Sequence, residues 1–242
     1  MPKFVELWIY LSATPLFGLT ATLVVYVLAQ AVYARLDQAP WANPVLWSVV
    51  VLAGLLTLTG VDYPTYFSGA QFIHFLLGPA VVALAWPLWE RRHELRQHWR
   101  ALLIASVVGG VAASGSALAL GWLAGLPHDV LLSLAPKSVT APVAMGIADK
   151  IGGIPALAAV FAVITGMVGA LSSKALMARL KIPTNQQGWM ARGFALGTAA
   201  HGIGAARAMH VNADAGAYAG LALGLQVVLA SLLIPLMFWL FG

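Results

Sequence analysis

Long apolar runs separated by short polar stretches dominate the chain. Most of the runs approach or exceed the roughly 20 residues that a helix needs to cross a bilayer. The pattern predicts an all-α, polytopic membrane protein with about six full spans. The predicted spans are Leu7–Tyr33, Pro44–Leu58, Phe72–Trp89, Leu102–Leu123, Pro155–Ala175 and Gly216–Leu240.

Two further segments are too polar or too short for lipid-facing helices. Residues 128–153 contain two prolines and a glycine pair, and residues 193–210 are rich in Gly and Ala. Backbone that leaves the helix at membrane depth is tolerated only where it is buried in protein or lines a cavity. We therefore predict two broken or re-entrant helical segments, a transporter-like layout that often derives from an inverted repeat. The sequence itself gives only weak support for such a repeat, between residues 81–88 and 227–236.

The charged residues predict how the chain is oriented. The stretch WERRHELRQHWR, residues 89–100, carries four arginines, and residues 176–192 are also basic. Such clusters lie on the cytoplasmic side of a membrane. Residues 128–153 should then enter the membrane from outside and residues 193–210 from the cytoplasm, with the N-terminus outside.

The composition agrees with a membrane protein. Hydrophobic residues make up 61% of the 242 residues and charged residues only 9%, against about 25% charged residues in soluble domains. No separate soluble domain stands out, so residues 1–242 are predicted to form one membrane domain. The net charge of +5 does not indicate a nucleic-acid partner, because the cations gather between the apolar runs.

Lys137 is the first candidate for chemistry, since a cation inside a membrane is costly unless it is paired or hydrated. In one interpretation, Lys137 lies at a cavity and attracts an anion, with Ser138 beside it. Thr140 is then predicted to cap a helix that has Pro142 in its first turn, and the start of a helix is itself an anion site. In the alternative interpretation, Lys137 reaches from an ordinary outer loop to the lipid head groups.

His201 and Arg207 form a second candidate cluster. Arg207 could bind a carboxylate through two hydrogen bonds, and His201 could hydrogen-bond the same anion or carry a proton. Alternatively, Arg207 ends a helix in cytoplasmic water and His201 is a satisfied core residue. Gly202 and Gly204 lie between them and make the local geometry hard to predict from spacing.

Nothing in the sequence favours an enzyme. The chain has neither an HExxH nor a GxSxG motif, and it has no cysteine. Adjacent residues such as Lys137 and Ser138 rarely form a nucleophile and its base. Without thiolates or a dense cluster of His and carboxylates, we expect no metal site and no cofactor.

Three stretches of the chain resemble the LrgB/CidB family. PKSVTAPVAMGIADKIGGIPALAAVFAVITGMVGA is similar to one family signature and GTAAHGIGAARA to a second, while TGVDYPTYFSGAQFIHFLLGPAVVALAWPL resembles its N-terminal half. Ala141 and Ala205 stand where the family more commonly has Thr. The site residues that match the family's motifs are Lys137, Ser138, Thr140, Pro142, Gly152, Gly153, His201, Gly202, Gly204 and Arg207.

The resemblance implies a multi-pass protein of the bacterial inner membrane. Family members often act with a small LrgA/CidA-type membrane protein, and we also expect a homo-oligomer. Plant relatives are glycolate/glycerate translocators, and some bacterial relatives are linked to pyruvate uptake. This favours a secondary transporter or facilitator of small monocarboxylates, with a small organic anion as ligand. The alternative is an antiholin-like regulator of murein hydrolase export and cell lysis.

Overall fold

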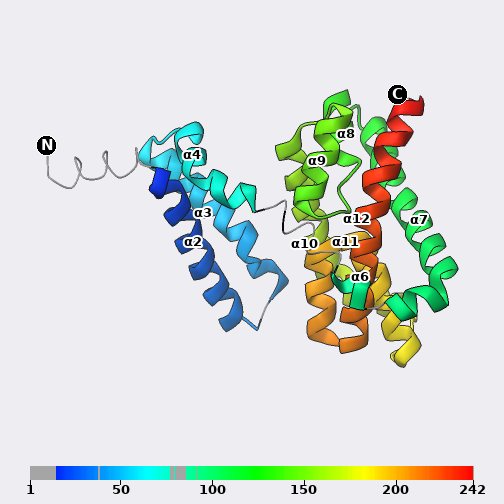
Figure 1. The fold of residues 1–242 in the computed structure, drawn as a ribbon. Helices are drawn as coiled ribbons and strands as arrows, with labels where there is room; N and C mark the ends of the chain where they lie inside the picture. The colour runs from blue at the N-terminus through cyan, green and yellow to red at the C-terminus, as the bar shows by residue number, and fades with distance from the viewer. Residues whose placement is uncertain (1–14, 38, 77–78, 80–85, 91, 242) are drawn as a thin grey trace, which may run out of the picture. The chain divides into compact units, whose positions relative to one another are not determined.

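The computed structural model describes residues 15–37, 39–76, 79, 86–90 and 92–241, and this part of the chain is helical and contains no strand (Figure 1). The chain divides into two compact units, residues 1–80 and 81–242. Each unit is described by itself below. The prediction of one domain over residues 1–242 stays a prediction.

The first unit contains α2 (Pro15–Arg35), the short 3₁₀ helix η1 (Pro40–Ala42), α3 (Pro44–Thr59) and α4 (Tyr63–Phe75). Asn43 starts α3, because its side chain accepts hydrogen bonds from the backbone N–H groups of Val45 and Leu46 at 2.9 and 3.2 Å. Helix α2 packs on α3 and α4. The Thr22 hydroxyl lies 2.7 Å from the hydroxyl of Tyr66 and ties α2 to α4.

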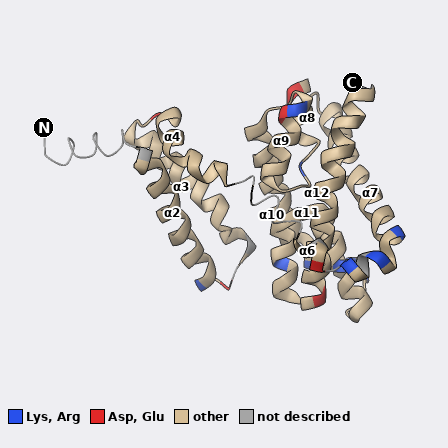
Figure 2. Ribbon diagram, in the orientation of Figure 1, with Lys and Arg blue, Asp and Glu red and all other residues tan. Residues whose placement is uncertain are grey.

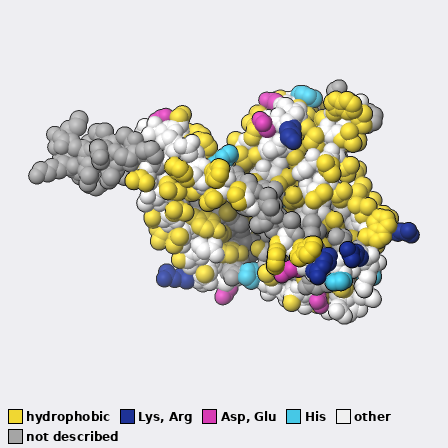
Figure 3. Space-filling view, in the orientation of Figure 1, with side chains coloured by type: hydrophobic (Ala, Val, Ile, Leu, Met, Phe, Trp, Pro, Cys, Tyr) yellow, Lys and Arg dark blue, Asp and Glu magenta, His cyan; other side chains and the backbone are white. Residues whose placement is uncertain are grey.

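The second unit contains the remaining helices. In chain order they are α6 (Trp86–Glu90), α7 (Arg92–Leu123), α8 (His128–Leu134), α9 (Ala141–Ile151), α10 (Pro155–Arg179), α11 (Gln186–Val211) and α12 (Ala213–Phe241). Charged residues lie mainly near the helix ends (Figure 2), and hydrophobic side chains cover much of the described surface in view (Figure 3). This distribution suits helices that cross a bilayer.

Among the described residues, four helices are long and apolar enough to cross a membrane: Leu16–Arg35, Arg96–Leu123, Pro155–Arg179 and Ala213–Leu240. By length and composition, they agree with four of the predicted spans. The predicted span Pro44–Leu58 is a helix of only 16 residues, short for a full crossing. Parts of the predicted spans Leu7–Tyr33 and Phe72–Trp89 lie outside the described residues, so the total of six spans stays a prediction.

Helices α8 and α9 form the first predicted broken segment and are joined by the non-helical residues 135–140. The Ser114 hydroxyl, within α7, donates a 2.7 Å hydrogen bond to the carbonyl of Ala135. Ser114 is nine residues from the end of α7 at Leu123, so the break lies about 13 Å inside the unit. Helix α9 then returns, because the backbone N–H of Ile154 donates to the Ser133 hydroxyl of α8 at 2.7 Å.

Helix α11 is the second broken segment, and its break lies at Ala200 and His201. A Cβ atom at Gly204 would lie 2.7 Å from Ala200 Cβ and 2.8 Å from the carbonyl oxygen of Leu196. In a straight helix, residues 196 and 204 would be about 12 Å apart along the axis. The second half of α11 therefore folds back on the first half, and the segment is a hairpin whose two ends lie on the same side.

The chain contains no cysteine, so single cysteines can test the two hairpins directly. We expect an impermeant maleimide to label Asn185→Cys and His210→Cys from one side of the membrane, because both ends of the α11 hairpin open there. Asp129→Cys and Lys150→Cys, at the open end of the α8–α9 hairpin, should be labelled from the other side. The readout is labelling in sealed vesicles of known orientation. Labels on Asn185 and His210 from opposite sides would show that α11 crosses the membrane once.

The contact between α11 and α12 gives a stability prediction. A Cβ atom at Gly197 would collide with the backbone carbonyl of Ala219 on α12. Gly197→Ala should therefore destabilise the protein by about 1–3 kcal/mol. Gly146→Ala is the matched control, since nothing lies within 4 Å of its new methyl group, and alanine favours a helix by about 1 kcal/mol. The apparent unfolding midpoint in detergent should fall for the first variant and stay or rise for the second.

Candidate functional site

The tip of the first hairpin, residues 135–140, holds Lys137 in a half-buried position. Its Nζ atom lies 3.4 Å from the hydroxyl of Ser138, which is only 6% exposed. Among the residues that the structure describes, no carboxylate forms an ion pair with this ammonium group. Lys137 is thus a cation that has a neutral hydroxyl beside it but no described anion, at a depth where a bare charge is costly.

The start of α9 adds positive potential at the same tip. Thr140 takes the N-cap position, as predicted, but its side chain makes no capping hydrogen bond. Its hydroxyl is instead buried, with no partner among the described residues. The first-turn N–H groups of a helix have no partners within the helix and carry the positive end of its dipole. The tip can therefore offer an anion an ammonium group, a hydroxyl and a helix start.

The tip of the second hairpin is formed by His201, which is 4% exposed. Its backbone has φ 40° and ψ −136°, values that an L side chain rarely adopts. The Nε2 atom of its ring lies 2.7 Å from the carbonyl oxygen of Ala162 on α10. Because a carbonyl can only accept, Nε2 donates, and in a neutral ring Nδ1 is left as an acceptor.

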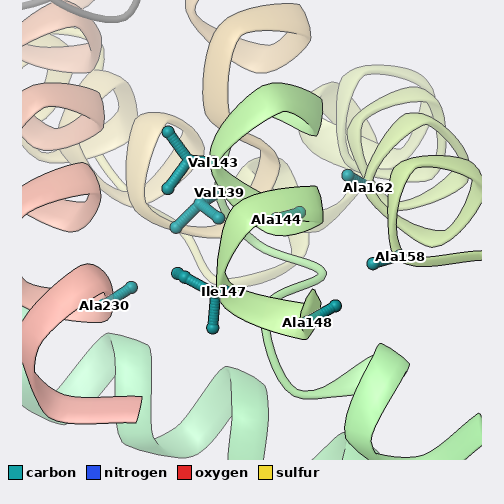
Figure 4. Packing of buried hydrophobic residues seen from close by; sticks show 8 residues of the cluster. All are labelled: Val139, Val143, Ala144, Ile147, Ala148, Ala158, Ala162 and Ala230. Atoms are coloured by element: carbon teal, nitrogen blue, oxygen red, sulfur yellow. The ribbon is translucent and has the colours of Figure 1, made fainter. Parts of the chain in front are cut away.

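The two tips meet beside α10. Ala162, which accepts the hydrogen bond from His201, belongs to a buried cluster with Val139, Ala144 and Ala158 (Figure 4). Val139 and Ala144 come from the first hairpin, so both hairpins pack on the same stretch of α10. Lys137 lies two residues before Val139 in the first hairpin. The structure therefore brings the tip that carries Lys137 together with the tip that carries His201.

The other predicted site residues lie at several places. Pro142 is in the first turn of α9, next to the tip. Gly152 ends α9 in the left-handed conformation (φ 87°), and Gly153 packs on the backbone of Ser133 in the last turn of α8. Gly202 and Gly204 follow the α11 break. Arg207 lies six residues after His201, about 9 Å along the helix, and no described contact joins it to Lys137. Its role in binding an anion stays a prediction.

A second group of buried polar residues was not predicted from the sequence. Gln226 on α12 is 3% exposed, and its Nε2 donates a 2.6 Å hydrogen bond to the carbonyl of Ser106 on α7. The hydroxyls of Ser106 and of Thr198 are buried, with no partner in the described part of the chain. The sequence did contain a signal for Gln226, because an amide side chain in a long apolar helix is uncommon and often functional.

A cavity of about 190 Å³ lies between α7, α12 and residues 135–139. Most of its lining is aliphatic or aromatic. The polar side chains that line it are those of Ser106, Ser114, Ser138 and Gln226. Ser138 belongs both to this wall and to the surroundings of Lys137, so the cavity adjoins the tip of the first hairpin.

Comparison with known proteins identifies the family. A model described as the LrgB-like family matches residues 22–240. The chain belongs to the LrgB-like family. This confirms the resemblance found in the sequence, and the spans of the structure agree with a multi-pass helical membrane protein.

Three relatives match this LrgB-like protein over nearly their whole lengths. YxaC of Bacillus subtilis (strain 168) is 34% identical over 91% of this chain and 94% of its own. YwbG of the same strain is 33% identical, over 88% and 92%. The holin-like protein CidB of Staphylococcus aureus (strain Mu50) is 28% identical, over 91% and 94%. No solved structure matches the chain.

The backbone of His201 gives a prediction that separates the ring from the break. In an ordinary helix, alanine is more stable than glycine by about 1 kcal/mol. With φ at 40°, we expect the reverse order, because a Cβ atom is strained there by about 1–2 kcal/mol. His201→Gly and His201→Ala both lose the hydrogen bond to Ala162, so their difference reports the backbone alone. An Ala variant with the higher unfolding midpoint would contradict a break at this residue.

Proposed function

We propose that this LrgB-like protein is a secondary transporter or facilitator of small monocarboxylates of the glycolate, glycerate or pyruvate class, in the inner membrane of a bacterium. The observation that supports this most is Lys137, a half-buried cation without a described carboxylate partner, where two hairpins meet. The activity is translocation in which no covalent bond forms or breaks. It therefore needs neither enzymatic groups nor a cofactor.

The groups around Lys137 suit a carboxylate. An ammonium group removed from water is stabilised by an anion, and hydrogen bonds to charged groups are stronger than those between neutral groups. The unpartnered hydroxyl of Thr140 and the start of α9 supply further donors beside it. His201 forms the tip of the second hairpin and packs on the same stretch of α10. An imidazole can bind and release a proton, so His201 is our candidate for coupling transport to a proton.

The arrangement of the hairpins supports movement between two open states. Transporters commonly bind their substrate near the bilayer midplane, where interrupted helices meet. Here one hairpin opens at the end of α7 and the other at the start of α11, so each can open a path to a different side. Arg207 lies in the second half of α11, between the tip and the open end of the hairpin, and in this proposal it meets the anion before or after Lys137.

A second function is favoured by one relative's name. CidB is called a holin-like protein, and an antiholin-like regulator would act by controlling a partner's pore rather than by binding a substrate. Either function is compatible with a small LrgA/CidA-type membrane partner and with a homo-oligomer. Only transport requires that an anion bind at Lys137.

Lys137→Met removes the charge and keeps an apolar side chain of similar length. Hydrogen bonds to charged groups contribute about 1.5–3 kcal/mol, so uptake of labelled glycolate or pyruvate at low concentration should fall about 10- to 100-fold. The assay uses the full chain in liposomes, alone and with the small partner. Lys150→Met is the matched control, because Lys150 is exposed at the far end of α9 and should leave uptake unchanged.

Two results would contradict this proposal. Uptake that is the same with Lys137→Met as with the unchanged protein would remove Lys137 from the site. If no organic anion enters the liposomes under any condition, while loss of the protein alters cell lysis, the regulatory function is the correct one.

A further inference from the structure

The cavity beside Lys137 is larger and more apolar than a two-carbon anion requires. Its volume is about 190 Å³, and a dry cavity of about 150 Å³ is enough to hold a benzene molecule. The space therefore suits an apolar group of about six heavy atoms. Leu229, Leu233 and Phe238 of α12 and Val107 and Val111 of α7 supply much of its wall.

The polar groups of the wall are few and partly used. The Ser114 hydroxyl already donates to the carbonyl of Ala135, and the Gln226 amide donates to the carbonyl of Ser106. None of the residues that line the cavity is charged. A second carboxylate in this space would be buried without a counter-charge, which is strongly unfavourable. The cavity thus suits an uncharged, aliphatic group.

We propose that the cavity holds the aliphatic body of the transported anion while Lys137 holds its carboxylate. The ligands that fit best are monocarboxylates with chains of about four to six carbons, which are longer than glycolate, glycerate or pyruvate, and dicarboxylates fit poorly. This inference rests on the proposed function, and it extends the substrate class of the same site to longer aliphatic chains.

The position of the cavity favours such an anion over a lipid tail. The Ser138 hydroxyl lies 3.4 Å from Lys137 Nζ, and Ser138 forms part of the cavity wall. The ammonium group that would bind the carboxylate therefore lies next to the apolar cavity. Ser114 in the wall is about 13 Å along α7 from its end. A phospholipid keeps its charged head at the surface and cannot pair it with Lys137 at this depth.

The expected signature is a dependence of affinity on chain length. Each methylene group that leaves water for the cavity should increase affinity about fourfold. Affinity should rise from acetate through butyrate to hexanoate. It should stop rising at octanoate, whose chain exceeds the volume of the cavity. Succinate should bind more weakly than butyrate.

Gly115 allows the cavity to be filled without touching Lys137. It lines the cavity, and nothing lies within 4 Å of a Cβ atom built on it, so Gly115→Leu adds an isobutyl group to open space. Gly146 on α9 is the matched control, since it has the same open surroundings and does not line the cavity. Val111→Phe adds bulk to the same wall from a position that is 64% exposed.

The experiment measures equilibrium binding of acetate, glycolate, butyrate, hexanoate, octanoate and succinate to the full chain in nanodiscs, with empty nanodiscs as the blank. In the unchanged protein and in Gly146→Leu, hexanoate should bind at least tenfold more tightly than acetate. In Gly115→Leu this preference should shrink to threefold or less, while acetate and glycolate bind as before. Val111→Phe should act in the same way and replaces Gly115→Leu if that variant does not fold.

The outcomes separate this inference from the proposed function. If no monocarboxylate binds in a manner that Lys137→Met abolishes, the proposed function fails, and the inference fails with it. If acetate or glycolate binds through Lys137 but chain length has no effect, the function stands and the inference is wrong. The inference is also wrong if both wall variants keep the preference for hexanoate, and a lipid tail is then the better occupant of the cavity.

Discussion

Backbone that leaves the helix inside a membrane must be enclosed by protein, because lipid cannot satisfy its polar groups. The second unit meets this requirement at both breaks. At the first break, the carbonyl of Ala135 accepts a hydrogen bond from Ser114 on α7. At the second break, Ala200 and His201 are buried, and the His201 ring holds the break against α10 through the carbonyl of Ala162. Ala158 and Ala162 are fully buried, and side chains this small allow the first hairpin to pack closely on α10. The helices that cross the unit thus serve largely to enclose two hairpin tips.

Enclosing the breaks has an electrostatic consequence. A hairpin tip exposes the end of a helix, and the start of α9 directs unpaired N–H groups and a positive dipole end towards the interior. Lys137 adds a full charge at that place, with no described carboxylate to balance it. The geometry that encloses the break between α8 and α9 therefore also concentrates positive potential at the tip of the first hairpin. An anion of the right size would relieve this potential.

The sequence predicted the breaks more reliably than the contacts. Pro136, Pro142 and the Gly152–Gly153 pair marked the first hairpin, and the Gly-rich stretch around His201 marked the second. Local signals of this kind act through the backbone of the residue that carries them, so they can be read without knowing the fold. The hydrogen bond from His201 to α10 could not be predicted, because it depends on which helix packs against the break.

The dependence on which helices pack together also explains the features that were not predicted from the sequence. Thr140 was correctly placed at the start of α9, but whether its hydroxyl caps the helix depends on neighbours that spacing does not reveal. Lys137 and Arg207 were each predicted to bind an anion because both lie near a break. The spacing could not show that α11 folds back on itself, which puts Arg207 along the second half of the hairpin. Gln226 was not predicted as a functional residue because a single polar residue hardly alters the pattern of a long apolar run.

The half-buried ammonium also bears on the choice between transport and regulation. A protein that only docks against a partner needs complementary outer surfaces, and a cation at its centre would lower its stability for no gain. Holding a lysine at membrane depth costs several kcal/mol unless something compensates for the charge. In a transporter, substrate binding offsets this cost, because the anion that stabilises Lys137 is the anion that the protein carries. The charge of Lys137 is then compensated only while the anion is bound. This cost is the physical reason for which we propose transport, with Lys137 as part of the binding site, ahead of regulation.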